Sequence, residues 1–495
     1  MKKREARHGD YSAKQWITFS SLIVIFSLIC WGAWAGVEKI SDSGRQITIG
    51  LQDMPTSLDM RTTWNPNAQR ILLQNVYQGL LIRNDQNEVA PGLASGWNES
   101  DNGLLYTFQL RKTYFSDGQR VNAEDAILSI ETLVKEKYPG YMDFAGVSSF
   151  TAPSPYTLQI HLSHPNPELL WYLAGPSSII IEPNKYNYQG LPVGAGPYVF
   201  SSQGPQSITL TRNRYYWNKP YYSTVVFKYF SSSSGELSAL KEGSIQGALD
   251  LSSSEGVPSS YNVSTGLSSK IVTLVFNDHP SSLMSDLKAR QSMRLLIDKN
   301  QVIAASGGLG LTVGGPIPRL DPGYEDLTSQ FPFNVEEGKS SIDYYYNKTF
   351  TLAYRNSLVK EAAESIKSQL AAVGINLQIY KLTPDQWTND VVNSMKYDMV
   401  LYISGGSHTL GTWVSGQTWW GWDSPQADRI YHQSILSPNY GTYTQGMSQT
   451  AKLVAQGQPA DWLYQMQLLG VWKKGISGAP QNLTDYCVPV FNLKG

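Results

Sequence analysis

The feature that most limits the fold is a strand–helix–strand pattern between residues 349 and 380. Apolar residues alternate in its two outer segments, which predicts strands, and recur at helical spacing between them, which predicts a helix. Ser357 is the expected helix cap and Gly374 the expected end. A unit of this length makes a parallel crossover, so this half of the chain is predicted to be α/β. The apolar residues of the pattern are Phe350, Leu352, Tyr354, Val359, Ala362, Ala363, Ile366, Leu370, Val373, Ile375, Leu377 and Ile379.

The length of 495 residues exceeds what one hydrophobic core usually serves, which predicts at least two lobes. We expect the chain to cross between them near residues 270 and 470. Local spacing further predicts a helix over 71–80, one helix over 285–306 and a buried strand over 397–403. The expected division is lobe I from residues 41–80, 190–270 and 471–495, a β-rich subdomain of lobe I inserted at 81–189, and lobe II from residues 271–470.

The N-terminal residues predict export of the rest of the chain. Residues 1–15 are basic, and the uncharged residues 16–37 are long enough to span a membrane. The positive-inside rule then places the basic tail in the cytosol and the body outside. Ala33 and Ala35 fit a cleavage site, so the apolar segment is either a retained anchor or a removed signal peptide. A third alternative, lipidation at Cys30, is less favoured because the residue before it is large.

All three alternatives place the rest of the chain outside the cytosol. The body lies either at the outer face of the cytoplasmic membrane or, after cleavage, in the periplasm or medium. A disulfide between Cys30 and Cys487 is not expected, since Cys30 lies in the apolar segment. The formal net charge of −1 provides no basic field for nucleic acid, so nucleic acid is not an expected partner.

Motifs for catalysis and metal binding are scarce. No HExxH, paired CxxC, Walker loop or G-x-S-x-G occurs, so we expect no enzyme activity, no cofactor and no metal site. One alternative is an exported serine hydrolase, since Ser357 and Lys360 have S-x-x-K spacing. Ser357 is, however, already expected to cap a helix. Another alternative has His408, just past a predicted strand, assist in capturing a metal chelate.

Aromatic residues gather in a loop after the predicted strand 397–403. Ligands of open α/β sheets bind outside the carboxyl ends of strands, and aromatic faces there can stack on a peptide, a sugar or an aromatic side chain. The alternative is that the tryptophans only pack the loop onto its own lobe. The residues concerned are Trp413, Trp419, Trp420 and Trp422.

Residues 91–133, PGLASGWNESDNGLLYTFQLRKTYFSDGQRVNAEDAILSIETL, join a strand pattern to a helix pattern through a turn. This stretch resembles the signature region of the oligopeptide- and dipeptide-binding family of extracytoplasmic solute-binding proteins, the receptors of ABC importers. GAGPYVF and TRNRYYWNKP are similar to further family segments in the same order. The resemblance implies an α/β, two-lobe periplasmic-binding-protein-like (Venus flytrap) fold of the large oligopeptide-binding type, with an extra β-rich subdomain in the first lobe.

The resemblance also implies a function. A monomeric receptor would capture a small solute, a peptide or a similar molecule, in the cleft between its lobes and deliver it to a membrane permease by hinge closure. Glycines after the strand end would permit close approach of a peptide backbone. The residues expected to bind the solute are Asp53, Pro55, Ser57, Tyr354, Tyr402, Gly405, Gly406, Ser407, His408, Trp413, Trp419, Trp420 and Trp422.

One departure from the family pattern concerns the amine of the solute. Peptide binders of the family often carry an aspartate after the strand that matches residues 397–403, at a position where this chain has Ser407. A buried ammonium without a partner is costly. Either Asp53 or Asp59 substitutes, or the solute has no free amine there, or the chain is a membrane-tethered scaffold that imports nothing.

Overall fold

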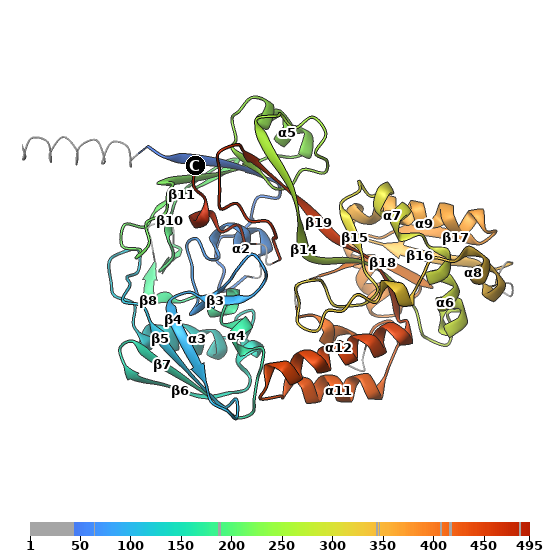
Figure 1. Cartoon of the computed structure of the whole chain (residues 1–495), viewed down its shortest axis with the longest axis horizontal. Helices are drawn as coiled ribbons and strands as arrows, with labels where there is room; N and C mark the ends of the chain where they lie inside the picture. Colours follow the sequence, from blue (N-terminus) through green and yellow to red (C-terminus); the bar gives the residue numbers. More distant parts are fainter. Residues whose placement is uncertain are drawn as a thin grey trace, which may run out of the picture.

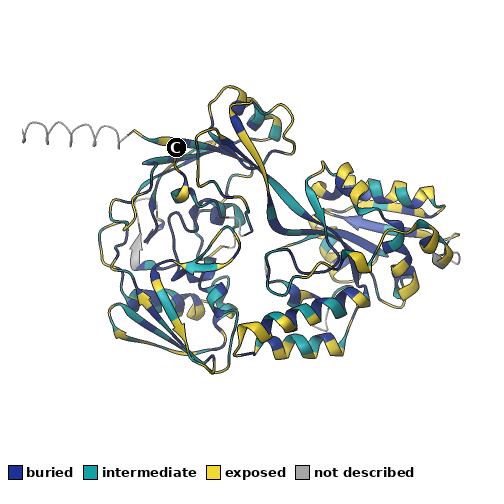
Figure 2. Ribbon diagram, viewed as in Figure 1, coloured by how far each residue is buried: buried dark blue, intermediate teal, exposed yellow. Residues whose placement is uncertain are grey.

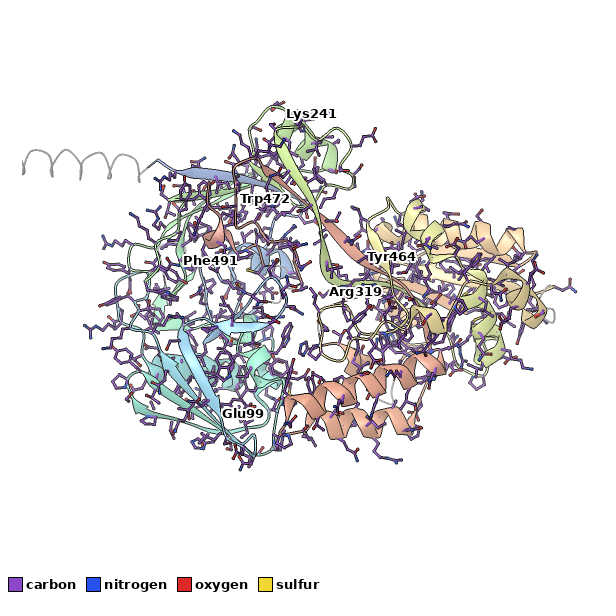
Figure 3. All side chains as sticks on the ribbon, viewed as in Figure 1. Glu99, Lys241, Arg319, Tyr464, Trp472 and Phe491 are labelled. Atoms are coloured by element: carbon purple, nitrogen blue, oxygen red, sulfur yellow. The ribbon has the colours of Figure 1, made fainter. Side chains whose placement is uncertain are left out.

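Two bodies lie side by side in the computed structural model, joined by the long antiparallel strands β14 (Tyr261–Phe276) and β19 (Ala460–Lys473) (Figure 1). Trp472 and Tyr464, both on β19, belong to the cores of different bodies (Figure 3). We call the body that contains Trp472 lobe I and the other lobe II. The expected two-lobe α/β fold is therefore confirmed. The structure describes residues 44–63, 65–186, 190–342, 345, 347–405, 408–414, 418–484 and 487–495.

One sheet runs through both lobes because β14 and β19 pair along most of their length. In lobe I, β1 lies between β12 and β13 and is parallel to both, while in lobe II β16 runs parallel to β17 and β18. The strand order is β10-β11-β12-β1-β13-β19-β14-β18-β16-β17, and β15 pairs with β19 outside this path. The remaining strands of this sheet are β1 (Gln46–Leu51), β10 (Tyr198–Gly204), β11 (Ser207–Arg212), β12 (Thr224–Tyr229), β13 (Gly247–Ala248), β15 (Gly310–Thr312), β16 (Thr349–Tyr354), β17 (Asn376–Lys381) and β18 (Met399–Ser404).

A four-stranded sheet in the order β4-β5-β7-β6 forms the core of a subdomain within lobe I. Strand β5 buries every second residue, as its spacing predicts. Helix α3 (Ala123–Lys135) begins at a capping box in which Asn122 and Asp125 exchange side-chain and backbone hydrogen bonds. The other elements between lobe I segments are β2 (Leu81–Arg83), β3 (Val89–Pro91), β4 (Ala94–Glu99), β5 (Leu105–Leu110), β6 (Val147–Ser154), β7 (Thr157–Leu162), α4 (Leu169–Tyr172), β8 (Ile181–Tyr186) and β9 (Pro192–Gly194).

Helices surround the sheet of lobe II, and α11 and α12 lie side by side and reach toward the lobe I subdomain (Figure 1). Strands of both lobes are largely buried, while the outer faces of these helices are exposed (Figure 2). The helices of lobe I outside the subdomain are α2 (Pro66–Leu72) and α5 (Ser233–Lys241). Those of lobe II are α6 (Leu287–Leu296), α7 (Lys299–Ala305), α8 (Val335–Ile342), α9 (Lys360–Ala372), α10 (Pro384–Gln386), α11 (Pro425–Ile435) and α12 (Tyr440–Gly457).

The predicted strand–helix–strand is present as β16, α9 and β17, and its two strands pair directly and in parallel. The prediction that Ser357 caps the helix is wrong. Asn356 accepts a hydrogen bond from the N–H of Leu358 and so begins a short 3-10 turn, Ser357–Val359, which precedes α9. Asn is as good a cap as Ser, so spacing alone did not separate the two residues.

Two other predicted helices differ from the structure. The helix expected over 71–80 is α2, which begins five residues earlier, at Pro66 after the Asn65 cap, and ends at Leu72 because Leu73 is extended. The helix expected over 285–306 is broken into α6 and α7. Ile297 is extended and the side chain of Asp298 caps the second helix, which satisfies backbone donors that a continuous helix would have bonded internally.

The two strands that join the lobes are irregular between Leu267 and Thr273, where their register shifts twice. Their register shifts between Leu267 and Ile271, and the carbonyl of Ser268 there accepts from the side chain of Gln465 at 2.5 Å. The hydroxyl of Ser268 donates to the carbonyl of Met466 at 2.9 Å. Side chains therefore replace regular ladder bonds at this point of the two joining strands.

Candidate functional site

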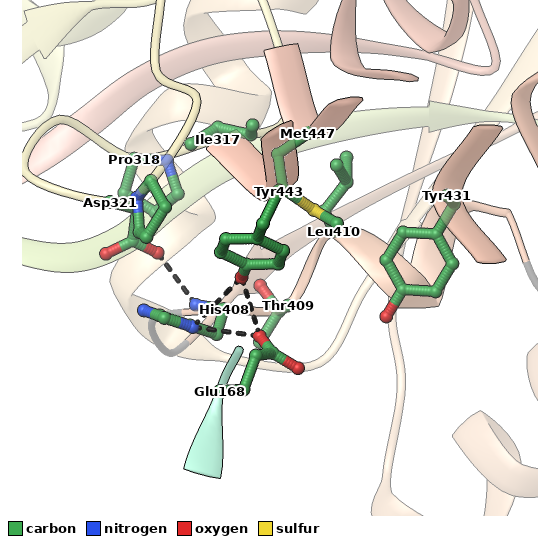
Figure 4. A pocket seen from close by; sticks show the side chains of 11 residues that line it. Glu168, Ile317, Pro318, Asp321, His408, Thr409, Leu410, Tyr431, Tyr443 and Met447 are labelled. Carbon is green, nitrogen blue, oxygen red and sulfur yellow. Dashed lines mark hydrogen bonds and ion pairs between the residues drawn. The ribbon is translucent and has the colours of Figure 1, made fainter. Parts of the chain in front are cut away.

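The lobes touch where the segment after β18 reaches the subdomain of lobe I. Nδ1 of His408 lies 2.9 Å from Oε1 of Glu168, and the hydroxyl of Tyr443 donates to the same oxygen at 2.9 Å (Figure 4). Glu168 precedes α4 in lobe I, whereas His408 and Tyr443 belong to lobe II. Both interactions therefore cross from one lobe to the other.

Local structure aims His408 at this contact. The end of β18 is fixed by Ser404, whose hydroxyl donates to the carbonyl of Ile271 at 3.1 Å. His408 has a φ of +62°, which turns the chain, and its N–H donates to Oδ2 of Asp321 at 2.7 Å. Glu168 makes no capping bond to α4, so its carboxylate is available to lobe II.

The indole of Trp171 lies between a ring and a cation. The imidazole of His408 stacks on it with centroids 3.9 Å apart and planes 16° apart. The guanidinium carbon of Arg83 lies 3.6 Å from the centroid of the same indole. Two groups this close cannot share one face, so they occupy opposite faces. The lobe II imidazole thereby completes a stack that lobe I begins.

The electrostatics of the contact favour a charged Glu168. Burial alone would raise the pKa of this carboxyl. The hydrogen bond and the charge of His408, followed by the hydrogen bonds from Tyr443 and Tyr172, instead hold its pKa below the usual range of a glutamate. Burial and the negative charge of Glu168 in turn raise the pKa of Tyr443. Glu168 is therefore an ionised carboxylate that accepts hydrogen bonds from His408, Tyr443 and Tyr172.

A second interlobe contact is made by Asp321. Its Oδ1 accepts from the side-chain amide of Asn87 in lobe I at 2.9 Å. Oδ1 of Asn87 accepts from Thr484, near the C-terminus, at 2.8 Å. Asp321 thus links the loop before α8 both to His408 and to the subdomain.

A charged cluster lies where β1 and β13 end in lobe I. Arg70 binds both carboxylate oxygens of Asp250, at 2.8 and 2.7 Å, and the N–H of Gln52 donates to Asp250 at 2.7 Å. Glu236 is fully buried beside them; burial, and then the charge of Asp250, raise its pKa to about 7. Burial, and then Arg70, lower the pKa of Lys270 on β14. Ionisable side chains of lobe I therefore lie near the irregular part of β14.

The candidate solute-binding residues Asp53, Pro55, Ser57 and Asp59 lie in the loop that follows β1 in lobe I. Pro55 and Ser57 line a depression together with Phe200 and Gln203, all within lobe I. Asp53 is exposed, with a φ of +56°. Asp59 binds its neighbour Arg61 at 3.3 Å, which holds the carboxylate in a local turn. Their part in solute binding stays a prediction.

The aromatic residues expected to bind solute pack mainly into lobe II. Trp413, Trp420 and Trp422 are 1%, 3% and 6% exposed in its core, which is the alternative considered from the sequence. Trp419 and Tyr402 are partly buried against the same core, with ring centroids 6.0 Å apart. Tyr354 is also buried in lobe II. Gly405 is exposed at the end of β18, while Gly406 and Ser407 lie outside the described residues.

Of the predicted residues that the structure describes, His408 is the one that lies at the interlobe contact. Sequence reasoning missed its partners Glu168, Trp171, Asp321 and Tyr443. Glu168 lies 240 residues from His408 and 275 from Tyr443, and no local spacing reports such pairings. The acidic residue at the start of the apolar run "ELLWYL" was the available signal, because an acid there either caps the helix or binds elsewhere.

The described residues contain no helix long and apolar enough to cross a membrane. The expected anchor or signal, residues 16–37, and Cys30 lie outside them. Within the described ranges, no three His, Cys, Asp or Glu side chains gather as a metal site. Cys487 is buried, and its thiol donates to the carbonyl of Leu73 at 2.9 Å.

Comparison with known proteins defines the class of this chain. The family model for bacterial extracellular solute-binding proteins, family 5 (middle), matches residues 88–435. The chain belongs to this family of solute-binding proteins, since the match covers more than half of its length.

Individual relatives are distant. A putative ABC transporter peptide-binding protein of Brucella ovis is 25% identical over 362 residues, which cover 68% of this chain and 66%, just under two thirds, of the relative. DppA from Helicobacter pylori in complex with a peptide superposes with a TM-score of 0.74 and 17% identity, over 92% of this chain and 99% of DppA. NikA from Brucella suis in complex with Fe(III)-EDTA superposes with a TM-score of 0.78 and 19% identity, over 91% of this chain and 99% of NikA. At these identities the structures establish the fold alone.

Proposed function

We propose that this protein is an extracytoplasmic receptor that captures a peptide or a similar small solute between its lobes and delivers it to the permease of an ABC importer. The observation that carries this proposal is the arrangement of two lobes that are joined by two irregular strands and touch through the segment after β18. Family membership supports it, since the family consists of solute-binding proteins.

Closure about the two joining strands is the proposed mechanism. Solute in the cleft would contact both lobes in the closed state, so it would shift the population toward closure. The irregular point at Ser268 and Gln465 would absorb the bending. The permease would then recognise the pair of lobe surfaces as closure sets them. We expect the receptor to act as a monomer, held at the outer face of the membrane if residues 16–37 are retained.

A peptide is the favoured solute class for a structural reason. Strand β18 pairs with β16 through Leu401 but no further in the described ladder. We propose that the backbone of Tyr402 to Ser404, which β16 does not pair, offers hydrogen bonds to an extended peptide, as in strand addition. Gly405, exposed at the strand end, would allow close approach. The name of the Brucella ovis relative agrees with this class.

The decisive experiment identifies the solute. Native mass spectrometry of the full chain, purified from its membrane fraction, should reveal a co-purifying small molecule. Titration calorimetry with peptides of matched length, some acetylated at the N-terminus, should then give saturable binding. Failure of every peptide and of metal chelates alike to bind would favour the scaffold alternative.

The hydrolase alternative loses its support in the structure. Lys360 is exposed and binds Glu361 at 3.2 Å, and the hydrogen bond and charge of that partner raise its pKa. A lysine base for Ser357 would need the opposite shift. We expect no covalent labelling of the chain by a β-lactam, and labelling that Ser357→Ala abolishes would restore this alternative.

A further inference from the structure

We propose that His408 and Glu168 form an interlobe latch, a contact built from the protein's own side chains that sets how readily the two lobes close. The latch residues come from elements far apart in the chain: the subdomain of lobe I supplies the carboxylate, and the segment after β18 in lobe II supplies the imidazole (Figure 4).

Three interactions converge on the single residue His408. Nδ1 lies 2.9 Å from Glu168, the ring stacks on Trp171 at 3.9 Å, and the backbone N–H donates to Asp321 at 2.7 Å. The side chains of His408 and Glu168 are 6% and 12% exposed, so water competes little with their bond. Opening the lobes would break the bond and the stack together.

The contact leaves little room for a solute group. The cavity beside it measures about 10 Å³, which is space for roughly one water molecule. The Glu168 carboxylate also accepts from Tyr443 and from Tyr172, at 2.9 and 3.0 Å. Solute is therefore excluded from Glu168 while the lobes touch, and it must bind elsewhere between them. This step rests on the proposed function.

The latch has a consequence for affinity that also rests on the proposed function. The apparent affinity for a solute scales with the fraction of molecules in the binding-competent closed state. A hydrogen bond to a charged group changes such an equilibrium by about tenfold or more. Removing the latch lowers the closed fraction and should therefore weaken solute binding by up to this factor, without touching the solute.

The test measures the distribution of distances between the lobes, with no solute added. Spin labels are attached to cysteines at Glu131 on α3 and Gln433 on α11, both exposed, in the full chain with Cys30 replaced by Ser. Double electron–electron resonance then reports the distribution of interlobe distances. The variant His408→Gly removes the imidazole without backbone strain, because its φ of +62° suits glycine. We expect the ratio of short to long distances to fall about tenfold.

Two further variants separate the latch from a general disturbance. Tyr443→Phe removes one donor to Glu168 and should shift the distances in the same direction but less. His432→Ala removes an exposed histidine that binds Asp428 within α11 at 3.2 Å, and should shift nothing. Unchanged distances in His408→Gly, or an equal shift in His432→Ala, would overturn the latch. Because no solute is added and any co-purified solute is first removed by dialysis, either result leaves the proposed receptor function to be judged separately.

Discussion

Replacing Glu236 by Gln should remove a defined part of the pH dependence of folding. Glu236 is fully buried, and its pKa is raised from 4.5 to about 7 by burial and by Asp250. In the unfolded chain this carboxyl returns to its ordinary pKa, so between these two values the folded state holds the proton more tightly. The stability it contributes is fully present below about pH 4.5 and is lost as the pH rises through 7.

The size of the effect follows from the shift. A difference of about 2.5 pKa units corresponds to roughly 3 kcal/mol between the free energies of unfolding below pH 4.5 and above pH 7. Gln keeps the shape of Glu236 and cannot ionise, so this part of the slope disappears in Glu236→Gln. Gln keeps only one of the two acceptor oxygens, which receive bonds from Gln52 and Leu249 at 3.3 Å, so a loss of about 1 kcal/mol in the free energy of unfolding is expected at every pH.

Urea unfolding followed by tryptophan fluorescence, at a series of pH values, gives the difference between the wild-type and variant free energies. Groups common to both proteins cancel in that difference. We expect the free energy of unfolding of the variant to increase relative to that of the wild type as the pH rises from about 4.5 to about 7. Above about pH 7 the variant should be the more stable of the two. Parallel pH profiles for the two proteins would refute the assignment of a raised pKa to Glu236.

Two other substitutions test the packing of the lobes. Asp461→Asn removes the buried carboxylate that binds Lys299 at 2.8 Å and Arg294 at 3.4 Å, and should cost about 3–5 kcal/mol in urea unfolding, whereas Glu361→Gln at an exposed pair should leave the free energy of unfolding nearly unchanged. Gly266→Ala would place a Cβ 1.5 Å from the carbonyl oxygen of Gln481, and should lower the melting temperature, whereas Gly96→Ala, where nothing lies within 4 Å, should leave it nearly unchanged. Equal effects within either pair would contradict the packing described here.

Patterns within one element were predictable from the sequence, whereas contacts between elements were not. The alternation in β5 and the crossover through β16, α9 and β17 follow from local periodicity, which burial against one core imposes. The break between α6 and α7 was missed because Asp298 acts as a cap inside an otherwise continuous helical pattern. Caps compete with helix continuation by a small free energy, which packing decides.

The candidate site divides in the same way. His408 could be predicted as a site residue because it follows the carboxyl end of a strand. The tryptophans of the same loop met the same criterion, yet Trp413, Trp420 and Trp422 lie in the core of lobe II. Position relative to a strand end does not determine which way a side chain turns. Glu168 was missed because two of its partners, His408 and Tyr443, come from the other lobe.

The central claim is that two lobes move about β14 and β19 and that solute holds them together. The most direct measurement is the distance distribution between labels at Glu131 and Gln433, recorded before and after adding the solute that co-purifies with the chain. We expect solute to shift the distribution toward the short distances of the closed arrangement. The shift should saturate with solute concentration and should be larger in His408→Gly than in the wild type. A distribution that stays the same in both proteins, with solute demonstrably bound, would contradict it.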